Sequence, residues 1–396
     1  MRSLAIGAAL ALGVVATFAV AAAETDLTFS DAEVRRILAH GPWPPAPRND
    51  PSNRVSGNEQ AIALGKALFF DRRLSGTGRI SCASCHQADR DFSDGLPRGM
   101  GIARSNRNTP SLANLSLRHW YGWDGANDNL WAQSLRPILD PREMGASLAS
   151  IAAMVRGRAE LSRLYREAFG SAPSASDEGV AVDAAKALAA FQETIATGRT
   201  PFDDFRDALA RGDTAGASRY PAAARRGLAI FIGKGRCNLC HSGPAFSNGE
   251  FHDTGISFFL EPGRVDPGRY EGIRHLKASR YNLLGPYNDD PTRASATGTR
   301  YVSLEHRNFG EFKVPSLRNV ARTAPYMHNG SLKTLRDVVR HYSEIDEERL
   351  HADGERILIP LRLSEKEIDD LIAFLESLSD GEERRRPKLP ASSPNQ

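Results

Sequence analysis

The chain has 396 residues, 41% of them hydrophobic, which is enough for two packed domains of ordinary size. Basic and acidic side chains nearly balance at a net charge of +3, so the composition gives no reason to expect nucleic-acid binding. The 34 Gly and 23 Pro predict many turns, as expected where the backbone wraps a large cofactor.

Residues 1–23 have the pattern of a secretory signal. Arg2 precedes an apolar run from Leu4 to about Val20, and three alanines stand just before Glu24. A permanent membrane anchor is the alternative, but the run is shorter than a comfortable bilayer span and ends in small residues. We therefore expect cleavage near Glu24 and a mature protein that is exported, in a bacterium to the periplasm, with no membrane association after cleavage.

All four cysteines fall in two C-x-x-C pairs, and each pair is followed by histidine: Cys82-Ala-Ser-Cys85-His86 and Cys237-Asn-Leu-Cys240-His241. With 10 His in the chain, a chance His after both pairs has odds of about one in 1,600. A zinc ribbon would explain neither His nor the long gap, and a thioredoxin-like pair needs a βαβ context. The spacing predicts two covalent haem c groups, with His86 and His241 as iron ligands.

The apolar pattern is mostly helical. Ser30 with Glu33, and Ser364 with Glu367, form capping boxes ahead of apolar residues at helical spacing. We expect further helices around 58–70, 148–169, 179–197, 222–233 and 332–342, and loops over the Gly/Pro-rich stretches 87–110 and 260–300. The segment 199–220 separates the two haem units, which predicts haem domains over 24–214 and 215–380 and a disordered tail over 381–396.

Five stretches around the haem motifs carry a family pattern. They are Leu64-Gly-Lys-Ala-Leu-Phe-Phe-Asp71, Arg107-Asn-Thr-Pro-Ser-Leu-Ala-Asn114, Trp123-Asp-Gly125, Phe312-Lys-Val-Pro-Ser-Leu-Arg-Asn319 and Thr323-Ala-Pro-Tyr-Met-His-Asn-Gly330. With them the mature chain resembles the bacterial di-haem cytochrome c peroxidase/MauG family over essentially its whole length. The resemblance implies a mostly α fold, with two cytochrome c-like haem domains joined at an interface and long loops. It also implies that the first haem reacts with peroxide while the second stores or relays electrons.

The resemblance places Gln133, Pro137 and Glu143 in the distal pocket of the first haem. Glu143 suits the chemistry, because splitting a peroxide heterolytically needs a group that takes one proton and delivers it to the leaving oxygen. Gln133 would hold that oxygen by a hydrogen bond, and Trp123 matches a tryptophan between the haems that can pass an electron. Without the resemblance, an ordinary surface carboxylate and amide and a core aromatic are the alternatives.

The sixth ligand of the second haem decides the branch of the family. MauG-like members supply Tyr fourteen residues after the His of the P-Y-x-H-x-G motif, a position that counts here from His328 to Tyr342. An anionic phenolate stabilises ferric and higher states, whereas a Met thioether favours reduced iron. His341 and Met327 are competing ligands. A plain core stripe at helical spacing is a further alternative, formed with Leu335, Val338 and Val339.

The resemblance also implies a calcium ion between the haem domains, held by Asn114 and the backbone carbonyls of Thr323 and Pro325, all hard oxygen donors. Two departures stand out. No His lies between His86 and His119, so we expect the first iron to be open rather than blocked by a loop histidine. Gly235 stands where MauG has a surface Trp that passes oxidation to its partner protein.

Together these residues imply a periplasmic di-haem peroxidase of the MauG-like branch. It would use hydrogen peroxide to form a high-valent di-haem state and oxidise an aromatic residue of a partner protein. The alternative enzyme is a cytochrome c peroxidase fed by a small electron-carrier protein. An alternative of another class is a non-catalytic di-haem electron-transfer cytochrome. No third haem motif is present in the sequence.

Overall fold

Helices form nearly all of the regular structure in the computed structural model, which describes residues 28–46, 48–350, 353 and 357–381. The expectation of a mostly α fold is therefore confirmed. The expected signal over 1–23, and the expected tail apart from Gly381, lie outside the described residues. Among the residues that are described, no helix is long and apolar enough to cross a membrane.

The helices and strands follow in chain order. The α-helices are α1 (Asp31–Leu38), α2 (Glu59–Phe70), α3 (Cys82–Cys85), α4 (Leu130–Leu139), α5 (Leu148–Gly157), α6 (Ala159–Phe169), α7 (Asp177–Glu193), α8 (Pro201–Ala210), α9 (Thr214–Ser218), α10 (Ala222–Ile232), α11 (Arg269–Ala278), α12 (Thr297–Tyr301), α13 (Leu335–Ser343) and α14 (Glu365–Glu376). Strand β1 (Phe251–His252) pairs antiparallel with β4 (Phe312–Lys313), and β2 (Phe259–Glu261) pairs antiparallel with β3 (Arg264–Val265).

Both predicted capping boxes form. The Ser30 hydroxyl accepts from the Glu33 amide, and the Ser30 amide donates to the Glu33 carboxylate at 2.8 Å. The same exchange between Ser364 and Glu367 starts α14. Each box satisfies amides at the helix start that have no intrahelical partner, which explains why the two helices begin where the sequence predicts.

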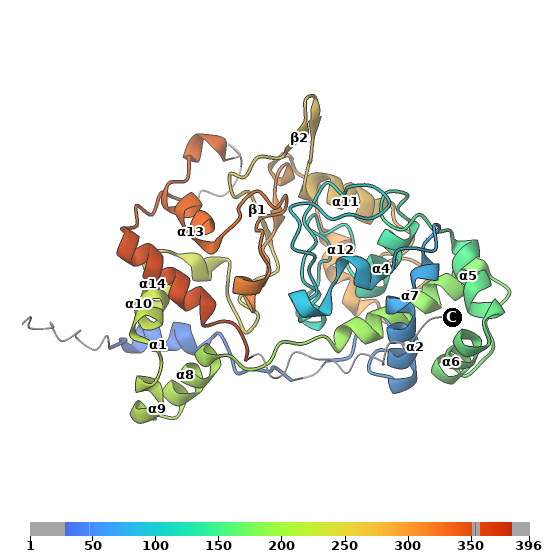
Figure 1. Ribbon diagram of the computed structural model, residues 1–396, viewed down its shortest axis with the longest axis horizontal. Coiled ribbons are helices and arrows are strands. Elements are labelled where there is room, and N and C mark those ends of the chain that lie inside the picture. Colours follow the sequence, from blue (N-terminus) through green and yellow to red (C-terminus); the bar gives the residue numbers. More distant parts are fainter. Residues whose placement is uncertain (1–27, 47, 351–352, 354–356, 382–396) are drawn as a thin grey trace, which may run out of the picture.

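Two hydrophobic cores divide the helices into two lobes (Figure 1). The first lobe packs α2, α4, α5, α6 and α7 together, and the second packs α1, α8, α10, α13 and α14. The first described helix, α1, therefore belongs to the second lobe, since it lies beside α8 and α10. The two-domain division itself stays a prediction. The change of core comes between Ile195 and Phe202, ahead of the expected boundary at residue 215.

A glycine allows the closest helix crossing in each lobe. A Cβ atom at Gly65 in α2 would lie 1.9 Å from the Ala187 carbonyl oxygen in α7. A Cβ atom at Gly227 in α10 would lie 1.9 Å from the Asp370 carbonyl oxygen in α14. Both pairs of helices therefore meet backbone to backbone, which no larger residue permits.

Three expectations about secondary structure are wrong. The helix expected over 148–169 is interrupted between Gly157 and Ala159, where Arg158 is extended and separates α5 from α6. The segment 199–220 is no simple separator, because it forms α8 and α9 and contributes Phe202 to the second core. The stretch 260–300 contains two helices and a hairpin, and its Tyr281 and Tyr287 pack against the core of the first lobe.

Residues 269–301 belong to the second half of the sequence but cover the first lobe, and we call them the strap. In Figure 1, α11 and α12 are drawn on the same side of the molecule as the first lobe. Lys186 of α7 binds the Asp289 carboxylate at 2.6 Å, and Asp128 accepts hydrogen bonds from Leu283 and Thr299. The strap therefore fastens the two halves of the chain to each other.

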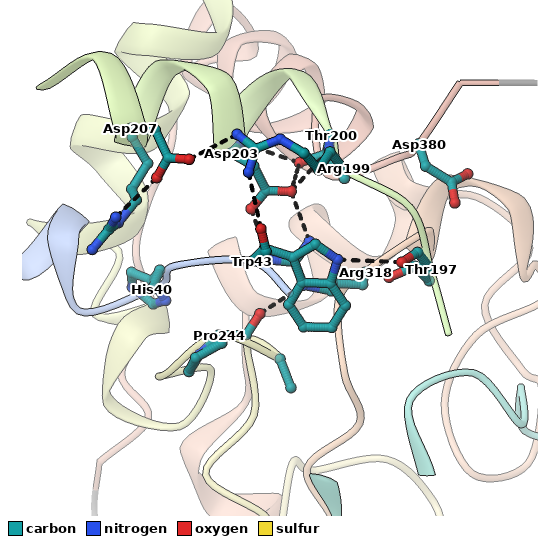
Figure 2. Close-up of polar contacts among 12 residues, drawn as sticks. His40, Trp43, Thr197, Arg199, Thr200, Asp203, Asp207, Pro244, Arg318 and Asp380 are labelled. Carbon is teal, nitrogen blue, oxygen red and sulfur yellow. Dashed lines mark hydrogen bonds and ion pairs between the residues drawn. The ribbon is translucent and has the colours of Figure 1, made fainter. Parts of the chain in front are cut away.

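A buried polar network fixes the point where the chain passes between the lobes (Figure 2). The Trp43 indole donates to the Thr197 carbonyl at 3.2 Å, and Arg199 donates back to the Trp43 carbonyl at 2.9 Å. The Arg318 guanidinium lies 3.5 Å over the Trp43 ring and pairs with Asp203. Two crossing segments are thereby held together.

Replacement of Gly227 by alanine tests the helix crossing. Gly227→Ala should lower the free energy of unfolding by about 1–3 kcal/mol, because the new methyl group must push α10 away from α14. Gly157→Ala is the matched control, since a Cβ there meets nothing within 4 Å, and it should be neutral or stabilising by up to about 1 kcal/mol. Denaturant midpoints measure both, and equal midpoints for the two variants would contradict the close crossing.

Candidate functional site

One cavity of about 1430 Å³ receives both C-x-x-C-H motifs and is lined by residues of both lobes. The residues that the sequence predicts for the haem, peroxide and calcium sites all line it: Cys82, Cys85, His86, Asn114, Trp123, Gln133, Pro137, Glu143, Cys237, Cys240, His241, Thr323, Pro325 and Tyr342. These residues are scattered over most of the sequence, so the fold alone brings them together.

The two motif histidines are oriented in the same way. His86 Nδ1 lies 2.9 Å from the Phe92 carbonyl oxygen, and His241 Nδ1 lies 3.0 Å from the Phe246 carbonyl oxygen. Such a contact places the proton on Nδ1 and leaves Nε2 as a ligand. Burial lowers the pKa of His86 and lowers that of His241 to about 4, so both rings are neutral, the form that binds iron.

All four motif cysteines lie in the described part of the chain, and no disulfide joins them. Burial raises the pKa of Cys82 and of Cys237 to about 12, and that of Cys85 to about 11. A short helix (α3) and a 3₁₀ turn (Cys237–Leu239) carry the pairs to the cavity wall. Paired thiols, a neutral imidazole with a free Nε2 and a cavity of this size fit the requirements of two haem c groups.

Glu143 follows α4 and faces the cavity near the first motif. Burial raises its pKa, and the nearby Asp140 carboxylate raises it further against the charges of Arg136 and Arg142. Its side-chain carboxylate has no hydrogen-bond or ion-pair partner among the described residues. A half-buried carboxyl group with a raised pKa and unused oxygens can both accept and donate a proton.

Gln133 and Pro137 lie on α4, which begins after the cap residue Asn129. The Gln133 side-chain oxygen accepts a hydrogen bond of 2.9 Å from the Asn127 amide. This bond fixes the amide orientation and leaves the Gln133 NH₂ group as a donor toward the cavity. Pro137 lacks an N–H to donate. Its carbonyl oxygen accepts a hydrogen bond of 3.1 Å from the backbone amide of Met144, the residue after Glu143.

Trp123 stands where the two lobes meet. Its indole donates to the Asn108 carbonyl at 2.9 Å, and its own carbonyl accepts from Lys313 at 2.8 Å. Beside it, Arg107 binds Asp124, its neighbour in the first half of the chain, and Asp266 of the second half, each at 2.6 Å. Burial alone would raise the pKa of Asp124, but Arg107 helps to hold it well below its usual range, so this contact is a charged one.

Tyr342 reaches the cavity from α13. Burial raises the pKa of its phenol well above the usual value, with smaller effects from Cys237 and Cys240, which places the side chain near the second motif. Its hydroxyl makes no hydrogen bond to another residue in the described ranges. By contrast, His341 Nε2 lies 2.7 Å from the Thr254 carbonyl, and this ring is not part of the cavity wall. Met327 does line the cavity.

The three expected calcium ligands, Asn114, Thr323 and Pro325, line the same cavity, but the side-chain oxygen of Asn114 already accepts a hydrogen bond. Asn114 is buried with a left-handed backbone, and its side-chain oxygen accepts from the Thr197 amide at 3.0 Å. One lone pair of that oxygen is therefore committed. The calcium site stays a prediction.

Sequence reasoning missed residues that position the site rather than form it. Gly101 is the clearest case, since a Cβ there would lie 2.6 Å from the Glu143 backbone. The loop approaches closely enough for Ile102 to donate to the Glu143 carbonyl at 2.9 Å. Gly99 and Gly101 in one loop were a visible signal of close approach, whereas nothing local distinguishes Asn127 as the partner of Gln133.

The chain is similar to known proteins in both sequence and fold. Residues 59–211 match the protein family described as "Di-haem cytochrome c peroxidase". The chain is 38% identical over 321 residues to methylamine utilization protein MauG of Methylorubrum extorquens, covering 81% of this chain and 78% of the relative. It is 32% identical over 380 residues to cytochrome-c peroxidase IdrP2 of Pseudomonas sp., covering 93% and 90%. The diheme peroxidase BthA from Burkholderia thailandensis superposes with a TM-score of 0.64 at 25% identity, covering 82% and 86%.

Proposed function

Because this chain belongs to the di-haem cytochrome c peroxidase family of peroxide-using oxidoreductases, we propose that it is a periplasmic, MauG-like member that oxidises an aromatic residue of a partner protein. The observation that carries the proposal is the single cavity that receives both C-x-x-C-H motifs, with Glu143 near the first and Tyr342 near the second. The two haems, when bound, supply the redox chemistry by which peroxide oxidises the protein substrate. The signal-like pattern over 1–23 supports export.

The residues near the first motif are suited to proton movement. The Glu143 carboxylate takes the proton from one peroxide oxygen and returns it to the other, which then leaves as water. The Gln133 NH₂ group, turned toward the cavity by Asn127, donates a hydrogen bond to the leaving oxygen. The His-free stretch between His86 and His119 supports an open first site.

The residues near the second motif are suited to holding oxidising power. Tyr342 and His241 would hold the iron of the second haem, because the Tyr342 side chain lines the cavity while His341 contacts the Thr254 carbonyl. Phenolate donation stabilises oxidised iron. Trp123, tied to both lobes by its carbonyl and indole, is the proposed path between the sites. A calcium ion at Asn114, Thr323 and Pro325 would brace this junction.

A second candidate is a cytochrome c peroxidase that takes electrons from a small carrier protein. Relatives with that name align over 93% of the chain, and Gly235 has no room for a side chain, since a Cβ would lie 2.7 Å from the Ile230 carbonyl oxygen. The two are separated by supplying peroxide with either a reduced small cytochrome c or the secreted protein encoded nearest in the genome. Stoichiometric oxidation of an aromatic residue in the latter, found by mass spectrometry, supports our proposal, and rapid turnover with the cytochrome alone contradicts it.

Glu143→Gln tests the proton transfer. The variant should keep both haems and cleave peroxide roughly a hundredfold more slowly, because an amide cannot carry the proton. Glu311→Gln is the matched control, another cavity-lining glutamate whose carboxylate instead accepts from Asn308 at 3.0 Å. Its stopped-flow rate should stay within about twofold of the unmodified protein. If Glu143→Gln and Glu311→Gln cleave peroxide at the same rate, Glu143 is not the group that transfers the proton.

The pH dependence gives an independent check. The rate should fall as the pH drops through the raised pKa of Glu143, because only the carboxylate form accepts a proton. In Asp140→Asn the neighbouring negative charge is gone, so that pKa should fall and the acid limb should move to lower pH. A pH–rate profile that does not move in Asp140→Asn argues against Glu143 as the titrating group.

Tyr342 variants test the second ligand. Tyr342→Phe should change the visible and electron paramagnetic resonance spectra of the haem on His241, and Tyr342→Met should raise its reduction potential. Tyr326→Phe is the control, because that cavity-lining hydroxyl donates to the Val320 carbonyl at 3.0 Å, and its spectra should be unchanged. An unaltered spectrum in Tyr342→Phe would move the ligand to Met327.

A further inference from the structure

Lys313 is a buried lysine on the wall of the cavity, where the two lobes meet. It ends strand β4 opposite Phe251, and its backbone amide donates to the Trp123 carbonyl at 2.8 Å. Only 7% of the residue is exposed. The strand pairing and the hydrogen bond to Trp123 hold the backbone of Lys313 in place, and the residue lines the cavity.

The Lys313 ammonium has no partner in the described part of the chain, where it makes no hydrogen bond and no ion pair. Asp124 is the acid whose negative charge acts on the Lys313 ammonium. That carboxylate is already bound by Arg107 at 2.6 Å and by the Ala126 amide at 3.1 Å. Arg118 also lines the cavity, and its guanidinium makes only a 3.5 Å contact with a backbone carbonyl.

A second buried lysine shows what is missing. Lys186 is 1% exposed, yet its ammonium binds the Asp289 carboxylate at 2.6 Å and the Tyr287 carbonyl at 2.8 Å. Buried ammonium groups are almost always paired in this way, because removal from water disfavours an isolated charge strongly. Lys313 and Arg118 together therefore require negative charge from something that occupies the cavity.

We propose that Lys313 and Arg118 bind the propionate carboxylates of the two haems at the place where the haem sites adjoin beside Trp123. The inference rests on the di-haem cofactor of the family. Carboxylates are the anionic groups that such a cofactor carries, and ammonium and guanidinium groups are their usual partners. Burial and the charge of Arg118 hold the pKa of Lys313 well below its usual value, and an arriving carboxylate favours the charged form again.

The placement gives Lys313 a role in tuning as well as binding. Its amide holds the Trp123 carbonyl while its ammonium holds the cofactor edge, so one residue fixes the tryptophan relative to the haems. A positive charge beside a haem stabilises the reduced form, which carries one more electron. Lys313 therefore raises the reduction potential of the haem that it contacts.

Potentials measured on the purified holoprotein test this inference. Lys313→Met keeps the length of the side chain and removes the charge, so at least one haem potential should shift downward in a spectroelectrochemical titration. Lys313→Arg should restore the potential, and Arg118→Gln should lower it in the same direction. Lys186→Met is the control, because it should reduce stability and leave both potentials unchanged.

Intact mass separates the outcomes. Two haems attached to Lys313→Met with potentials equal to those of the unmodified protein would overturn the inference. If Lys313→Met does not fold, the same equality in Arg118→Gln overturns it. A mass without haem in the unmodified protein would instead remove the cofactor premise. If Lys313→Met and Arg118→Gln show the predicted downward shifts in potential but the unmodified protein oxidises no partner protein, this inference stands and the proposed function fails.

Discussion

Arg318 is completely buried, and its charge is met by the equally buried Asp203 through hydrogen bonds of 2.9 and 3.0 Å. The same guanidinium donates to the Pro244 carbonyl at 2.6 Å, in the loop that follows His241, and lies 3.5 Å over the Trp43 ring (Figure 2). Removing one partner of such a pair typically costs about 3–5 kcal/mol. The orientation of the second motif histidine, the N-terminal arm and the start of α8 all depend on this contact.

The surroundings of the two motifs differ within one shared cavity. Near the first, Glu143 has unused oxygens and a raised pKa, which suits it to proton exchange. Near the second, burial raises the pKa of the Tyr342 phenol, which disfavours a free phenolate unless a cation accepts it. Between them Trp123 is pinned by hydrogen bonds to both lobes, while the charged bridge of Arg107 keeps the junction closed. A division of labour between the two sites therefore has a structural basis in burial and hydrogen bonding.

The parts of the molecule that could be predicted are those written in contiguous residues. The C-x-x-C-H motifs, and the capping boxes at Ser30 and Ser364, act over a few neighbouring positions, so their geometry follows from spacing. The strap could not be predicted, because α11 has little apolar pattern of its own and its close contact, between Gly272 and the Asp124 backbone, joins residues far apart in the sequence. Long-range choices, such as Asn127 for Gln133, leave no local trace.

The structure relates two short segments of the sequence that repeat without a fixed period. Gly65-Lys-Ala-Leu-Phe69 and Gly227-Leu-Ala-Ile-Phe231 precede the two motifs, and in each the glycine meets a partner helix while the phenylalanine enters the core. The helix before each motif is thus built alike. The unequal distance from each glycine to its first cysteine hides the repeat from any search at constant spacing.

The strap also constrains the order in which the protein is made. Ribosomes produce the first lobe before residues 269–301 exist, so for a time α4 and α7 lack the segment that covers them in the finished fold. The first lobe therefore gains the ion pair at Lys186 and the hydrogen bonds at Asp128 only after the strap has been made. Its packing depends on a segment that follows it by many residues in the sequence.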